Sequence, residues 1–168
     1  MEELINCLEK ETKEFEGLLT LSQKKTPVIV NNKIDELVKI TEEEQIIVGR
    51  ISGLEMKRET VTKDIAEVIN KDVEDLKLTT LIELMSNQPG ERKRLSDVHD
   101  KLSGIVKQIR QVNENNAELL KHALEMVNFD LSIVTAMRQA PETANYSRGA
   151  MNTGSMLGGS MGGFDAKQ

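Results

Sequence analysis

The stretch that decides the fold is NKIDELVKITEEEQIIVGRISGLEMKRETVTKDIAEVIN, residues 32–70. Its apolar residues recur on alternating three- and four-residue steps, the a/d pattern of a packed amphipathic helix. Two charged residues, Glu44 and Arg58, stand where this pattern expects apolar side chains, as a register-setting polar layer or snorkelling stems would. As one helix the stretch would be about 58 Å long. Its seam consists of Leu37, Ile40, Ile47, Ile51, Leu54, Val61, Ile65 and Val68.

The residues before this stretch predict a shorter helix over about 3–25, because Leu and Phe side chains recur there at helical spacing. Pro27 follows, and a proline disfavours helical geometry at the residue before it. We therefore expect this first helix to end ahead of Pro27. Asn31 or Asn32 is then a candidate N-cap for the second helix.

A third long helix is predicted over 90–138, with Pro89 suited to its first position. Asn116 occupies a place in this helix that the register assigns to an apolar residue. The apolar seam is carried by Leu95, Val98, Leu102, Ile105, Ile109, Val112, Leu119, Ala123, Met126 and Ile133.

Between the long helices, residues 70–88 are typical of a connector with a short helix, in which Leu76, Leu81 and Leu84 would pack against the long helices. The sequence thus predicts an all-α fold. We expect an elongated antiparallel helical bundle or coiled coil of three long helices plus a short connector helix.

The composition changes at Pro141, and the last residues hold more than half of the eleven glycines. These residues have no periodicity and little charge, and such a segment cannot bury enough surface to offset the entropy lost on ordering. We predict a helical domain over 1–140 and a flexible, disordered Gly/Met-rich tail over 141–168.

Composition narrows the function classes. The chain has 22 Lys+Arg against 28 Asp+Glu, a formal net charge of -6, which argues against nucleic-acid binding. Aromatic residues are 2% and Trp is absent, which disfavours a compact sheet protein or a pocket enzyme. The N-terminus is acidic rather than signal-like, and uncharged apolar runs are too short to span a bilayer. We therefore expect a cytoplasmic protein.

Residues able to carry chemistry are few and scattered. Cys7, His99 and His122 have no metal-ligand spacing, so no metal, cofactor or small-molecule substrate is expected. A histidine phosphotransfer domain would use an exposed His such as His99. However, Lys101 and Gly104 follow it at offsets of two and five, whereas that pattern needs three and four. An enzyme is therefore not expected, and phosphotransfer stays a minor alternative.

Three motifs together resemble the FlgN-type flagellar export chaperones. The long helix carries a Glu-Gln pair at Glu44 and an Arg after Leu-Glu at Arg58. A short Leu-rich connector, LTTLIELM, follows at 78–85. The segment QVNENNAELLKHALEMVNF at 111–129 has the spacing Asn-x-x-Asn-x-x-Leu-Leu-x-x-x-Leu. The resemblance covers roughly residues 1–140, and it rests on the order of these motifs rather than on any one of them.

The resemblance implies function by binding. Such chaperones hold the hook-associated proteins, which form the hook–filament junction, in the cytosol and deliver them to the flagellar type III export gate. An amphipathic helix of the partner would lie in an apolar groove. Tyr146, followed by Gly149, resembles a docking motif for the gate. The implied partner-binding residues are Asn113, Asn116, Leu119, Leu120, Ala123, Leu124, Met126, Val127 and Ile133.

Two readings of this segment stay open. The third helix has two apolar rows, Leu119/Met126/Ile133 and Leu120/Leu124/Val127, and either row could be core or partner surface. A structural coiled coil that forms homo-oligomers through the same seam is the second hypothesis. Because the seam runs into the asparagines without a break, we expect VNENN to mark where a bundle helix gives way to a partner-receiving helix.

Overall fold

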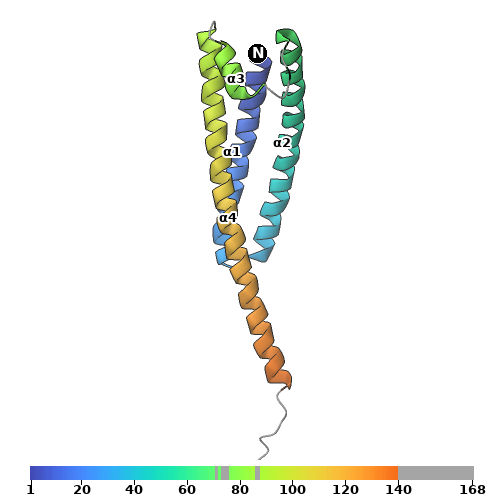
Figure 1. Cartoon of the computed structure of the whole chain (residues 1–168). Helices are drawn as coiled ribbons and strands as arrows, with labels where there is room; N and C mark the ends of the chain where they lie inside the picture. The colour runs from blue at the N-terminus through green and yellow to red at the C-terminus, as the bar shows by residue number, and fades with distance from the viewer. Residues whose placement is uncertain (71, 73–75, 86–87, 140–168) are drawn as a thin grey trace, which may run out of the picture. The chain divides into compact units, whose positions relative to one another are not determined.

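The computed structural model describes residues 1–70, 72, 76–85 and 88–139. Within these ranges every regular element is a helix and no strand occurs, which confirms the all-α prediction. Figure 1 shows the helices in chain order. They are α1 (Glu2–Val30), α2 (Ile34–Ile69), α3 (Leu78–Leu84) and α4 (Pro89–Gln139). The predicted tail over 141–168, including Tyr146, lies outside the described residues.

Helix α1 runs through Pro27, so the prediction that it ends before this residue is wrong. A proline inside a helix removes one backbone hydrogen bond and crowds the preceding turn. The following residues, Val28 and Ile29, are buried, and their packing offsets that cost.

The two asparagines after α1 end that helix and do not cap α2, so this prediction too is wrong. The Asn31 amide donates to the Pro27 carbonyl at 2.6 Å. Asn32 has a φ of 53°, the left-handed conformation in which a helix commonly ends. Lys33 occupies the N-cap of α2 without a side-chain cap bond.

Helices α1 and α2 pack against each other in opposite directions. The Cys7 thiol donates to the Leu54 carbonyl at 3.3 Å, whereas further along α1 the Ser22 hydroxyl donates to the Glu44 carboxylate at 3.3 Å. Residues later in α1 therefore contact residues earlier in α2, so the two helices are antiparallel. The predicted seam of α2 faces inward for most of its length, but it fails in the last turn. There Val68 is 86% exposed, and Ala66 is buried in its place.

Side chains of α4 contact α1 in the same direction along the chain. Arg94 donates to Glu9 at 2.8 Å, and Asn116 donates to the Ser22 carbonyl at 2.8 Å. Residues later in α4 therefore contact residues later in α1, so these two helices are parallel. Pro89 is the first residue of α4, as predicted.

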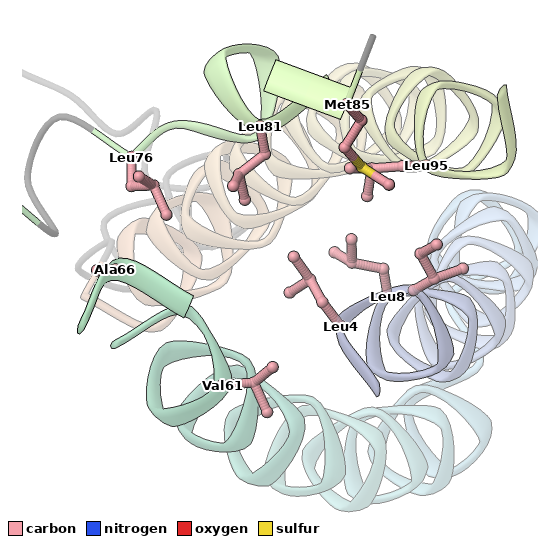
Figure 2. Close-up of a cluster of buried hydrophobic side chains, with 9 residues drawn as sticks. Leu4, Leu8, Val61, Ala66, Leu76, Leu81, Met85 and Leu95 are labelled. Carbon is pink, nitrogen blue, oxygen red and sulfur yellow. The ribbon is translucent and has the colours of Figure 1, made fainter. Parts of the chain in front are cut away.

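A cluster of buried apolar side chains lies around the start of α1, where all four helices contribute (Figure 2). In α3, Leu81 is 1% exposed and enters the cluster, whereas Leu84 is 46% exposed. The connector prediction is therefore confirmed for Leu76 and Leu81 and wrong for Leu84. The members are Leu4, Ile5, Leu8, Val61, Ala66, Leu76, Leu81, Met85 and Leu95.

By their contacts, the residues divide into two compact units, with the boundary in the chain between Asn128 and Phe129. The first holds α1 to α3 and most of α4. Of the second, the structure describes the helical residues 129–139. Among the described helices, none is both long enough and apolar enough to cross a bilayer.

Candidate partner-binding site

An apolar groove of about 260 Å³ lies in the first unit, where the end of α1 and the start of α2 face α4. Its α4 wall is a single helical row at spacings of three and four residues. Its opposite wall exists because α1 continues past Pro27. We call this the apolar groove; its lining residues are Val28, Ile29, Asn32, Lys33, Ile34, Leu37, Leu120, Ala123, Leu124 and Val127.

The groove row of α4 is only partly covered. Leu120 and Val127 are exposed, and Leu124 is 63% exposed. Exposed apolar side chains in a contiguous patch are uncommon unless they serve an interaction. In the second unit, residues 129–139 of α4 carry further exposed apolar side chains, which are Phe129, Leu131, Ile133, Val134 and Met137.

The structure distributes the nine predicted site residues unevenly. Leu120, Ala123, Leu124 and Val127 line the apolar groove together. The other row is not brought to the groove. The remaining residues are exposed (Asn113, Met126 and Ile133), half-buried (Leu119) or buried (Asn116).

Asn116 is 4% exposed, and its amide joins α4 to α1. Its nitrogen donates to the Ser22 carbonyl, and its oxygen accepts from the Thr26 hydroxyl at 2.7 Å. On α2, Glu44 accepts from the Ser22 hydroxyl and forms an ion pair with Lys25. We call Ser22, Lys25, Thr26, Glu44 and Asn116 the polar layer. It bonds α1 to both long neighbours at one level, which fixes how the helices align.

Replacing Asn116 with Ala should lower the free energy of unfolding by about 1–3 kcal/mol, because the Ser22 carbonyl and Thr26 hydroxyl would lose their partner in a buried place. Urea denaturation followed by circular dichroism measures this. Asn115→Ala is the matched control, since Asn115 is an exposed neighbour. Equal losses in the two variants would contradict the role of the Asn116 amide.

Nearer the start of α1, Glu11 is 2% exposed and accepts a hydrogen bond from Arg58 at 3.1 Å. Arg58 is the second charged residue in the α2 seam, after Glu44. Both of these seam residues therefore have polar partners on α1. Burial raises the pKa of the Glu11 carboxyl above its ordinary value of 4.5, and Arg58 opposes this only in part. The ionised form of Glu11 is therefore disfavoured by folding.

The stability of the chain relative to a Glu11→Gln variant should depend on pH. A raised pKa means that the folded state holds the proton more tightly, so the contribution is fully present below about pH 4.5 and lost as pH rises through the raised value. We expect the two proteins to be similar at about pH 4, where protonated Glu11 resembles Gln, and the variant to gain in relative stability towards pH 7. Urea denaturation of both proteins across this pH range measures the difference in their free energies of unfolding. A wild type that gains stability relative to the variant as pH rises would contradict this prediction.

The side chains considered for chemistry do not line the groove. His99 contacts the adjacent Asp100 carboxylate at 3.0 Å, and His122 is exposed beside Glu125. Burial raises the pKa of the Cys7 thiol, which keeps it protonated. Across the described ranges, no three His, Cys, Asp or Glu side chains gather as a metal site would require.

Sequence reasoning missed the wall of the groove formed by α1 and α2. Val28 and Ile29 fell beyond the helix end predicted at about residue 25, and Ile34 lies outside the α2 seam. The apolar run VIV at 28–30 was the available signal, because such a run directly after a proline needs a surface to pack against.

The fold and the site together define an all-helical protein with an apolar groove beside a long helix. The family model described as "FlgN protein" matches residues 1–154, and the chain belongs to the FlgN family. Membership implies a flagellar export chaperone in general. The match extends beyond the described helices and covers Tyr146 and Gly149, but it stops short of the last residues. Curated proteins and solved structures gave no match.

Proposed function

We propose that this chain binds hook-associated proteins in the cytoplasm, prevents them from assembling early, and delivers them to the flagellar export gate. The apolar groove carries the proposal. In a flagellar export chaperone, an exposed apolar row on a long helix is a surface suited to an amphipathic helix of the exported subunit.

The chemistry of the groove supports a helical client. Leu120, Leu124 and Val127 follow one another at four and three residues, so a helix laid alongside α4 can interleave its own apolar row with theirs. Lys33 and Asn32 are the polar members of the lining, and the other eight residues are apolar. A client whose terminal segment folds only on binding would bury its apolar face here and leave its polar face in water.

Prevention of assembly follows from the same contact. A terminal helix held in the groove is withheld from the packing that it would make in the assembled junction. The proposal involves binding alone, with no catalysis, cofactor, small-molecule substrate or nucleic acid.

Size-exclusion chromatography tests the proposal. The purified chain is mixed at micromolar concentration with helical terminal segments of hook-associated proteins, and we expect comigration at a mass that includes the segment. Absence of comigration would contradict the proposal. Sedimentation separates it from the self-associating coiled coil, which predicts a homo-oligomer whose mass does not change when the segment is added.

For Tyr146 we propose contact with the export gate, because the family match includes this residue. Tyr146→Ala should leave client affinity unchanged and lower the export of hook-associated proteins severalfold. Titration calorimetry measures the first effect, and the amount of client in the culture medium measures the second. Tyr146→Phe serves as the conservative control. A fall in client affinity would contradict a role confined to the gate.

A further inference from the structure

A second candidate for the apolar groove is a part of this same chain. The groove has seven strongly apolar lining residues, and no described residue closes it. An uncovered apolar patch tends to recruit whatever apolar segment is held nearest to it. The question is therefore what occupies the groove before a client arrives.

The sequence after helix α4 contains a matching segment, AMNTGSMLGGSMGGF, residues 150–164. It has no charged residue, so entry into an apolar groove costs no desolvation of charge. Methionine has an unbranched, adaptable side chain that fills irregular apolar surfaces. The large apolar residues of this segment are Met151, Met156, Leu157, Met161 and Phe164.

The chain length suits such a contact. From Val127 to the end of α4 at Gln139 there is about 18 Å of helix. The chain from Gln139 to Met151 spans up to about 40 Å when fully extended. The apolar residues beyond Met151 have still more chain available. The segment can therefore reach the groove without strain.

We propose that residues 150–164 bind the apolar groove of their own chain and compete with the client. A segment tethered over this length acts at an effective concentration on the order of millimolar, so even a weak apolar contact is substantially populated. A client of micromolar affinity displaces it, with its apparent affinity lowered by the fraction occupied. The family match ends at residue 154, so most of this segment lies outside the pattern that the family shares.

Paramagnetic relaxation tests the contact on the full chain and needs no client. A nitroxide is attached to a Ser160→Cys variant in a Cys7→Ser background, and methyl signals of Leu120, Leu124 and Val127 are recorded. We expect these signals to broaden severalfold more than those of Leu4, which lies in the core cluster. Equal broadening at both places would overturn the proposal. So would broadening that appears only when labelled and isotope-enriched chains are mixed, because the occupant would then be a second copy.

An independent measurement avoids the cysteine substitutions. The five apolar residues of the segment are replaced with Ser at unchanged chain length, and binding of 1-anilinonaphthalene-8-sulfonate is compared with wild type. We expect fluorescence to rise severalfold in the variant, because the groove is freed. An unchanged signal would overturn the proposal.

Client binding separates this proposal from the proposed function. The Ser-substituted variant should bind a hook-associated terminal segment about threefold to tenfold more tightly. Unchanged client affinity in this variant would overturn the competition while leaving the chaperone function intact. Failure of both proteins to bind any client, with the relaxation contact present, would instead contradict the chaperone function alone.

Discussion

Replacing Leu124 and Val127 together with Asp should weaken binding of a hook-associated terminal helix by roughly 100-fold, with no loss of helicity. Both side chains line the apolar groove and are exposed, so charged replacements leave the folded chain undisturbed. In a complex they would place two unpaired carboxylates in a desolvated contact, and central apolar anchors are typically worth one to several kcal/mol each. Titration calorimetry gives the affinity, and far-ultraviolet circular dichroism checks the helices.

The chain provides a matched control for this variant. Met56 on α2 is 63% exposed, the same fraction as Leu124, but it does not line the groove. Met56→Asp should leave client affinity within about twofold of wild type. A loss of similar size from Met56→Asp would mean that the client binds along another face of the helices, and the groove would no longer be the site.

Substitutions in the core cluster should instead lower the stability of the folded chain. Leu81→Ala should lower the free energy of unfolding by about 2–5 kcal/mol, because the side chain is fully buried where all four helices meet. Leu84→Ala, three residues further along the same short helix, should cost no more than about 0.5 kcal/mol. Urea denaturation monitored by circular dichroism measures both. Similar costs at the two positions would contradict the orientation of α3.

The long helix α2 was predictable because its apolar pattern is sustained over 36 residues and depends only on local geometry. The same pattern misplaced Val68, since α2 ends at Asn70 in a left-handed conformation and Ala66 reaches the cluster instead. At Pro27 the local preference against proline within a helix was outweighed by the burial of the residues that follow it. Helix ends depend on what the last turn packs against, which periodicity does not contain.

Only one wall of the apolar groove could be predicted from the sequence. The α4 row was visible because Leu120, Leu124 and Val127 share one helix face. The opposite wall comes from segments about ninety residues earlier, and no local pattern pairs them. Asn116 shows the same division. Its polar interruption of the seam was visible, whereas its partners Ser22 and Thr26 emerge only from the contact of α1 with α4.

Site-specific crosslinking in flagellated cells tests the central claim most directly. A photo-crosslinking residue is placed at Leu124 in one variant and at Met56 in another, and the products are identified by mass spectrometry. We predict a crosslink to a hook-associated protein from position 124 and none from position 56. Crosslinks to such a protein from position 56 alone, or none from position 124, would contradict the groove as the place where this chaperone holds its client.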